Sequence, residues 1–344
     1  MEILFQIILL IIGFVILIKG ADVFVDGASA TAENFKVPKM LIGLTIVAFG
    51  TSAPEFAVSV KSLLSGNTDM LLGNVIGSNI LNILLILGVA SMIKPLVVQH
   101  NTVKKELPIV MLMTLMFATL MLDNLFDNSV VPSFTRQDGF VIVLAFCIFI
   151  HYLIQVNRKR KNAAEDGVDD KTAAEKNEVS VSEKTEKDQP AMKLIKALFF
   201  VLIGIFGIVI GSNFVVDSAS EIAKILGVSS KLIALTVVAL GTSLPELVTS
   251  VVATKKGEVE IAIGNVVGSN IFNIGVVTGI PVALLGGISK ISFSPVDLVV
   301  MVVSSILLFI FARNDRRISR LEGAVFLVMF VAYYSFVIIS GLAM

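Results

Sequence analysis

The chain repeats itself after a shift of 191 residues, and no gap is needed to align the two copies. Residues 41–60 (LIGLTIVAFGTSAPEFAVSV) align with residues 232–251 (LIALTVVALGTSLPELVTSV), and 13 of these 20 positions are identical. Residues 73–88 (GNVIGSNILNILLILG) align with residues 264–279 (GNVVGSNIFNIGVVTG), with 10 of 16 positions identical. A shared apolar composition would not place two polar motifs in the same register twice. The sequence therefore indicates a duplication, and the fold must accommodate two copies of one unit.

Both copies consist mainly of apolar runs. Hydrophobic residues make up 56% of the chain and charged residues 16%, against about 25% charged in globular proteins. Even this low charge is concentrated, because residues 158–196 hold ten of the 27 Lys and Arg and nine of the 27 Asp and Glu. The composition indicates a multi-pass membrane protein. A net charge of zero without a basic face argues against nucleic acid as a partner. The single cysteine, Cys147, excludes an intramolecular disulfide framework and a Cys-rich metal site.

We expect an all-α polytopic membrane protein with ten transmembrane helices, since runs of about 20 apolar residues span a bilayer. The expected spans are residues 3–32, 39–64, 70–93, 106–122, 138–156, 194–224, 230–253, 259–285, 295–312 and 321–341. The first run lacks the positive n-region of a secretory signal, so we expect it to be retained. Each copy contains an odd number of spans, so the second copy enters the membrane from the opposite side. The sequence therefore predicts two inverted five-helix repeats.

The predicted organisation is a first repeat over 1–157, a charged loop over 158–191 and a second repeat over 192–344. The loop has too few large apolar residues to fold alone, which predicts a flexible linker. Basic residues cluster at 94–105, 158–161, 255–256 and 313–320, in loops that share one side if ten helices alternate. The positive-inside rule makes that side cytoplasmic. We therefore expect a cell membrane (inner or plasma membrane) protein with a cytoplasmic central loop and both termini outside.

A proline interrupts the second and the seventh spans at equivalent places. The motifs are Gly-Thr-Ser-Ala-Pro-Glu over 50–55 and Gly-Thr-Ser-Leu-Pro-Glu over 241–246. Proline lacks an amide hydrogen and clashes with the preceding turn, so it breaks a helix. We expect freed carbonyls at about Ala48 to Thr51 and at about Ala239 to Thr242. Irregular backbone at membrane depth is tolerated where it is buried in protein or lines a cavity, so the breaks indicate a binding site.

Glu55 and Glu246 end these motifs and are the decisive residues. A charge at the bilayer centre costs about 2.5–3.5 kcal/mol on insertion scales. Two carboxylates without a basic residue in either motif indicate a bound cation. Together with the hydroxyls of Thr51, Ser52, Thr242 and Ser243 they form a hard oxygen set that suits Ca²⁺, which takes about 6–8 oxygens, and Na⁺ almost as well. A proline kink with a protonated or hydrogen-bonded Glu is the alternative reading.

The third and eighth spans are expected to supply the rest of the cage. Ser78 and Asn82 are four residues apart and share a helix face, as do Ser269 and Asn273. Asn74 and Asn265 either contribute amides to the cage or form hydrogen bonds between helices. The pairs Gly73 with Gly77 and Gly264 with Gly268 have the small-xxx-small spacing that permits close helix packing.

Other charges in the spans have plainer interpretations. Lys19 and Asp22 are three residues apart and are expected to pair on one helix face. Asp26 and Asp217 occupy equivalent positions, which we expect to lie near a membrane interface.

With its paired motifs, the chain resembles the cation/Ca²⁺ exchanger superfamily and, within it, the Na⁺/Ca²⁺ exchangers with their two α-repeats. The resemblance covers essentially the whole chain. It implies antiport of Na⁺ against Ca²⁺ by alternating access, with a ratio of about three to one and a coupling to voltage of about 2.3 kcal/mol per charge per 100 mV. By position, the implied ligands are Ala48, Thr51, Glu55, Ser78, Asn82, Ala239, Thr242, Ser243, Glu246, Ser269 and Asn273. Asn273 stands where the K⁺-dependent exchangers carry Asp, which argues against K⁺ coupling.

Ca²⁺ and Na⁺ are thus the expected partners within a lipid bilayer, no cofactor is expected, and a monomer is the expected functional unit. Three alternatives are open at this point. An exchanger of the same fold could use H⁺ in place of Na⁺, and a channel would conduct without a counter-ion. A membrane-embedded enzyme would need a nucleophile or metal centre, but the sequence contains neither H-E-x-x-H nor G-x-S-x-G, and His100 and His151 lie at span ends.

Overall fold

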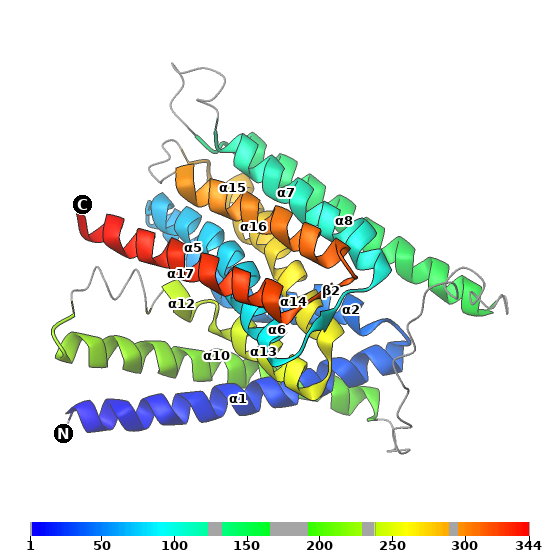
Figure 1. The fold of residues 1–344 in the computed structure, drawn as a ribbon, viewed down its shortest axis with the longest axis horizontal. Helices are drawn as coiled ribbons and strands as arrows, with labels where there is room; N and C mark the ends of the chain where they lie inside the picture. The colour runs from blue at the N-terminus through cyan, green and yellow to red at the C-terminus, as the bar shows by residue number, and fades with distance from the viewer. Residues whose placement is uncertain are drawn as a thin grey trace.

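The computed structural model describes residues 2–122, 133–165, 192–228, 237, 239–288 and 295–343, and this part of the chain is almost entirely helical (Figure 1). The elements of the first half are α1 (Glu2–Phe35), α2 (Lys39–Ile42), η1 (Gly43–Val47), α3 (Ala48–Thr51), α4 (Ala53–Leu64), α5 (Thr68–Leu81), η2 (Asn82–Leu87), α6 (Gly88–Ile93), β1 (Leu96–Val97), η3 (Thr102–Glu106), α7 (Leu107–Leu120) and α8 (Arg136–Glu165). Those of the second half are α10 (Leu194–Ile225), α12 (Ala239–Gly241), α13 (Leu244–Lys256), α14 (Val259–Phe272), η6 (Asn273–Thr278), α15 (Gly279–Leu285), α16 (Pro295–Arg313), β2 (Arg317–Ile318) and α17 (Arg320–Ala343). The η elements are short π-helical segments.

Membrane-length helices dominate the described residues. Seven of them are long and apolar enough to cross a bilayer, and the bent pair Lys39–Thr51 with Ala53–Leu64 makes an eighth. Their positions agree with the apolar runs of the sequence, and the prediction of a multi-pass helical membrane protein is confirmed. The two short strands are the exception to an all-α description.

The long helices α1 and α10 lie side by side along one edge of the molecule (Figure 1). Glycines allow this close approach: a Cβ atom added at Gly20 would lie 2.7 Å from the backbone of Gly207. The two helices share a hydrophobic cluster, whose members include Leu17, Phe24 and Ile208. Parts of η1, α13 and α14 also contribute to this cluster. A second and larger cluster, with Leu84, Val110 and Phe326, holds the other helices together. The α1–α10 pair is therefore a separate layer of the fold.

Contacts between loops show which of them share an end of the molecule. Strand β1 follows α6 and pairs antiparallel with β2, which lies between α16 and α17. Gln99, just after β1, donates to Glu260 of α14 at 2.5 Å. The loops at 94–101, 256–260 and 314–319 therefore lie at one end. At these residues the structure agrees with the grouping of basic loops in the sequence.

Two details differ from the sequence predictions. Helix α8 continues to Glu165, past the predicted start of the linker, and the sequence there is rich in helix-forming Lys, Arg, Ala and Glu. The remainder of the predicted linker, residues 166–191, lies outside the described residues. The predicted pairing of Lys19 with Asp22 is wrong, because the Asp22 carboxylate lies 2.8 Å from the Lys256 ammonium.

Close packing at the small-residue motif is confirmed for the second repeat. A Cβ atom at Gly264 would lie 2.8 Å from the Met40 carbonyl oxygen, and one at Gly268 would lie 2.7 Å from the Ala48 Cβ. Helix α14 therefore packs directly on α2, η1 and α3, which carry the first proline motif. The residues at the positions equivalent to η1 in the second repeat lie largely outside the described residues.

Candidate functional site

The two proline motifs break their helices in the same way. Ser52 separates α3 from α4 with φ −83° and ψ 6°, and Ser243 precedes α13 with φ −90° and ψ 5°. In the first motif the two helical parts are bent by 46°. The Ser52 amide still donates to the Ala48 carbonyl at 3.0 Å, so the prediction that this carbonyl is freed by the break is wrong. The Thr51 hydroxyl also lies within hydrogen-bond distance of this carbonyl, at 3.4 Å.

The bends bring the two carboxylates into the protein interior. The Glu55 side chain is 0% exposed and that of Glu246 is 1% exposed. Both lie in the first turn of a helix, where the helix dipole favours negative charge. No Lys or Arg in the described part of the chain forms an ion pair with either carboxylate. The site is therefore acidic and without a protein counter-charge.

Each carboxylate accepts a hydrogen bond from the other repeat. Ser243 donates to Oε1 of Glu55 at 3.4 Å, and Ser52 donates to Oε1 of Glu246 at 3.0 Å. This reciprocal pattern joins the two motifs at one place, as the sequence predicts. The Oε2 atoms of both glutamates are buried and have no hydrogen-bond partner.

Helices α5 and α14 bring further oxygens to the same place. The Ser243 and Ser78 hydroxyl oxygens lie 3.0 Å apart, so Ser243 can accept from Ser78 while it donates to Glu55, which links the second motif to α5. Asn82 donates to Asn270 at 2.9 Å but leaves its own Oδ1 without a partner. The hydroxyl of Ser269 and both polar atoms of the Asn273 side chain are likewise buried without a partner.

The π-helical segments η2 and η6 begin at Asn82 and Asn273, so the two repeats depart from α-helical geometry at the same residue. Such π-helical insertions within α-helices occur frequently at functional sites. Here each one begins at a predicted ligand that leaves a side-chain oxygen without a partner.

The motif threonines form a second set of contacts between the repeats. Thr51 donates to Asn265 at 3.0 Å, and Thr242 donates to Asn74 at 3.3 Å. Asn265 and Asn74 in turn donate to the backbone carbonyls of Glu246 and Glu55, at 3.4 Å and 3.3 Å. The hydrogen-bonding alternative is therefore the one that the structure supports for these two asparagines. They hold the helix breaks in place, a role that the sequence left open.

Among the predicted ligands, Ala239 begins α12, which ends at Gly241 just before the second break, and Ala48 is fully buried at the start of α3. Most of the predicted residues thus lie at or just before the two breaks, Asn82 and Asn273 begin the π-helical segments, and Ser78 and Ser269 lie one helical turn before them. Oxygen is the only donor type that these residues offer, apart from the asparagine amide nitrogens. In the described residues no group of three or more His, Cys, Asp or Glu gathers elsewhere as a metal site. The chemistry of the site is therefore that of a hard cation.

Comparison with known proteins agrees with this chemistry. The sequence profile of the family described as "Sodium/calcium exchanger protein" matches residues 5–155 and 196–339. The "Sodium/calcium exchanger MaX1" of Methanosarcina acetivorans is 31% identical, over 95% of this chain and 96% of its own length. The "Inner membrane protein YrbG" of Escherichia coli is also 31% identical, over 92% of this chain and 91% of its own. A solved structure of the sodium-calcium exchanger NCX_Mj, soaked with Na⁺ and Ca²⁺, superposes with a TM-score of 0.78 at 29% identity and covers 96% of this chain and 98% of the other. The chain therefore belongs to the sodium/calcium exchanger family.

Proposed function

We propose that this cation/Ca²⁺ antiporter exchanges Na⁺ for Ca²⁺ by alternating access, with both ions bound at the broken helices. One observation carries the proposal: five oxygens of the predicted ligand set are buried and have no hydrogen-bond partner. They belong to Glu55, Glu246, Asn82, Asn273 and Ser269. Leaving a buried polar group unpaired costs about 1–3 kcal/mol, and more for a charged one. A hard cation would satisfy all five.

The proposed ligand set adds hydroxyl oxygens that already take part in hydrogen bonds, those of Thr51, Ser52, Thr242, Ser243 and Ser78. The backbone carbonyls of Ala48 and Ala239 complete the set. Hydroxyl oxygens that donate one hydrogen bond keep lone pairs for a cation. Ca²⁺ takes about 6–8 oxygens at irregular geometry, and this set is large enough for one Ca²⁺ or for several Na⁺ that share its members.

Charge balance makes the exchange obligatory. With both carboxylates ionised, the site without ions carries about two negative charges, and burying each of them unpaired costs several kcal/mol. One Ca²⁺ neutralises the pair, and so do two Na⁺. Only loaded forms then close and cross readily, so net leakage of one ion is suppressed. Every Na⁺ beyond two makes the cycle electrogenic, at about 2.3 kcal/mol per charge per 100 mV.

The proposed architecture is ten spans in two inverted five-helix repeats, over 1–157 and 192–344, joined by the loop 158–191. Inverted repeats can exchange conformations, which provides two equivalent openings on opposite sides. Because the basic loops share one end, the positive-inside rule makes that end and the central loop cytoplasmic, with both termini outside. A monomer contains the complete site and suffices for transport.

The test is ⁴⁵Ca²⁺ uptake into proteoliposomes driven by an outward Na⁺ gradient. Glu55→Gln and Glu246→Gln each remove one charge while preserving shape, and we expect either change to abolish uptake. Glu106→Gln is the matched control, because Glu106 is also a buried glutamate, 5% exposed, but hydrogen-bonds to Tyr152 away from the site. Wild-type flux in either site variant would refute the ligand roles. Uptake driven by a pH gradient without Na⁺ would replace Na⁺ with H⁺ as the coupling ion.

A further inference from the structure

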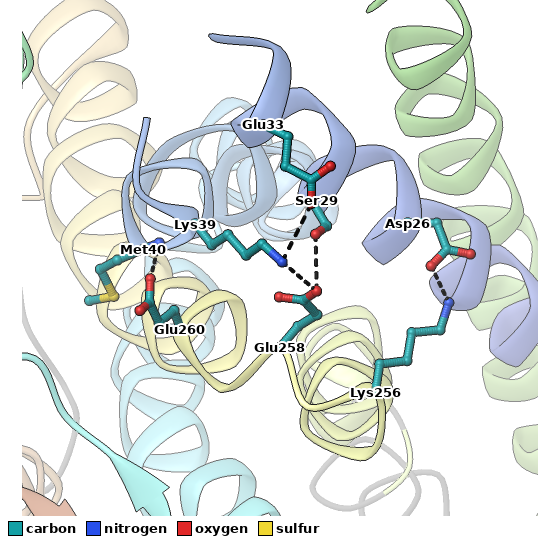
Figure 2. A network of polar contacts seen from close by, with 8 residues as sticks. All are labelled: Asp26, Ser29, Glu33, Lys39, Met40, Lys256, Glu258 and Glu260. Carbon is teal, nitrogen blue, oxygen red and sulfur yellow. Dashed lines mark hydrogen bonds and ion pairs between the residues drawn. The ribbon is translucent and has the colours of Figure 1, made fainter. Parts of the chain in front are cut away.

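Ion pairs fasten α1 to the C-terminal end of α13. The Lys256 ammonium lies 2.6 Å from the Asp26 carboxylate and 2.8 Å from that of Asp22 (Figure 2 shows the first of these contacts). It also donates to the backbone carbonyl of Asp22 at 2.8 Å. Lys256 ends the helix whose first turn carries Glu246, so these ion pairs connect α1 directly to a helix of the candidate site.

The turn after α13 adds a second group of contacts (Figure 2). Glu258 lies 2.7 Å from the Lys39 ammonium and accepts from the Ser29 hydroxyl at 3.0 Å. Lys39 also faces Glu33 of α1 at 3.7 Å. The turn between α13 and α14 is therefore held to both α1 and α2 at the end of the molecule that carries the basic loops.

The equivalent place, between α10 and the turn after α4, lacks most of these charges. With the shift of 191 residues, Lys256 corresponds to Ser65, Glu258 to Asn67 and Asp22 to Asn213. Asp26 corresponds to Asp217, and Glu33 corresponds to Lys224, which has the opposite charge. None of the ion pairs in the described residues joins α10 to the turn between α4 and α5. In the described residues, the ion pairs of Lys256 and Glu258 are thus present at one end of the molecule only.

Packing shows the same asymmetry. The face of α13 that carries Leu244, Val248 and Val252 packs against the cluster of α1 and α10. The equivalent residues of α4 are Ala53, Ala57 and Lys61, and all three are exposed.

A shallow, open depression runs along this face of α4, and its lining comes from this helix and its C-cap alone: Phe56, Ala57, Val60, Lys61, Leu64 and Ser65. Helix α1 packs closely on α13, whereas α10 makes no comparable contact with α4. In the described residues, α1 therefore covers α13 at the end where the ion pairs lie, whereas α10 leaves the equivalent face of α4 exposed.

We propose that Lys256, Asp22 and Asp26, with Lys39 and Glu258, form a one-sided latch that stabilises the state closed at the cytoplasmic end and open at the other. This inference rests on the proposed alternating-access exchange, because a latch needs two states to choose between. Inverted repeats of equal sequence would populate both states similarly. An ion-pair network between the repeats at one end alone therefore gives the carrier a preferred resting conformation.

The test uses cysteine labelling and needs no transport. In a Cys147→Ser background, Val248→Cys reports opening between α1 and α13, and Ala57→Cys reports opening at α4. In purified full-length protein, Lys256→Met is expected to increase the rate of maleimide labelling at Val248→Cys by about twofold to thirtyfold, the range for two partly exposed ion pairs. Lys256→Arg, which keeps the charge, is the matched control and should label like the wild type.

Two further variants keep the proposal falsifiable if Lys256→Met fails to fold. Exchanging the charges, with Lys256→Asp and Asp26→Lys together, should restore slow labelling at Val248→Cys. A latch built at the other end, with Ser65→Lys and Asn213→Asp beside Asp217, should slow labelling at Ala57→Cys by a similar factor. Unchanged labelling in Lys256→Met, or in the rebuilt latch, would overturn the latch. Because ⁴⁵Ca²⁺ flux is measured separately, a loss of Na⁺ coupling would be seen as a failure of the proposed exchange and not of the latch.

Discussion

The two motif asparagines should differ in their contribution to stability, although they occupy equivalent positions in identical Gly-Asn-Val sequences. Asn265 is 0% exposed and takes part in three hydrogen bonds, with Thr51 at 3.0 Å, the Glu246 carbonyl at 3.4 Å and Ser250 at 3.0 Å. Asn74 is half-buried and takes part in two, both at 3.3 Å. The perturbation that tests this difference is truncation of each asparagine to alanine.

The magnitude follows from hydrogen-bond energies measured between transmembrane helices, which average about 0.6 kcal/mol and reach about 1.7 kcal/mol. Two short, fully buried bonds and one longer bond predict a loss of about 2–3 kcal/mol for Asn265→Ala. Two long bonds at a half-buried position predict about 1 kcal/mol for Asn74→Ala. The comparison is internal, because both substitutions remove the same atoms.

The assay is equilibrium unfolding in mixed micelles with increasing SDS, followed by the loss of helicity. A double-mutant cycle between Asn265→Ala and Thr51→Val should give a coupling energy of about 0.6–1.7 kcal/mol, because it isolates one contact between the repeats. An equal or larger loss for Asn74→Ala would refute the reasoning, since it would show that burial and partner number do not set the cost. A coupling energy near zero would show that the Thr51 contact is not formed.

Three further outcomes are expected. Gly20→Ala should destabilise the protein by about 1–3 kcal/mol, because its Cβ would lie 2.7 Å from the Gly207 backbone, whereas Ile12→Ala on an exposed part of the same helix should cost much less in thermal unfolding. Ca²⁺ at about 100 times its Kd should stabilise the protein by about 2.7 kcal/mol, EGTA should reverse this, and Glu246→Gln should show no such shift; stabilisation of that variant by Ca²⁺ would contradict the site. Cys147→Ser should retain full flux and stability, because this exposed cysteine faces away from the site, and a large loss in either would show a contact that the structure lacks.

The duplicated motifs make much of the site predictable from the sequence. A proline within an apolar helix predicts a break in that helix. A carboxylate beside the break predicts a polar environment, because a buried charge needs polar partners. The register of the repeat then requires Glu55 and Glu246 to occupy equivalent places. The cross-repeat hydrogen bonds from Ser243 and Ser52 agree with that expectation. The sequence is informative here because a helix break and a carboxylate both destabilise a membrane helix unless a ligand or protein group compensates for them.

Other features depend on contacts that a linear pattern does not contain. Lys19 and Asp22 have helical spacing, but Asp22 meets Lys256 because α1 passes the end of α13. A proline predicts that hydrogen bonds are lost, but not that the Ser52 amide still reaches the Ala48 carbonyl. The difference between α4 and α13 is also invisible in the aligned motifs. Two equivalent helices can be packed differently in a single conformation. The aligned motifs do not indicate which conformation the structure adopts.

The reciprocal serine–glutamate bonds have a consequence for reading substitutions at the site. A substitution at Ser243 alters the surroundings of Glu55, in the other copy of the motif, and a substitution at Ser52 alters those of Glu246. The effect of a serine variant in one copy therefore has to be sought at the carboxylate of the other copy.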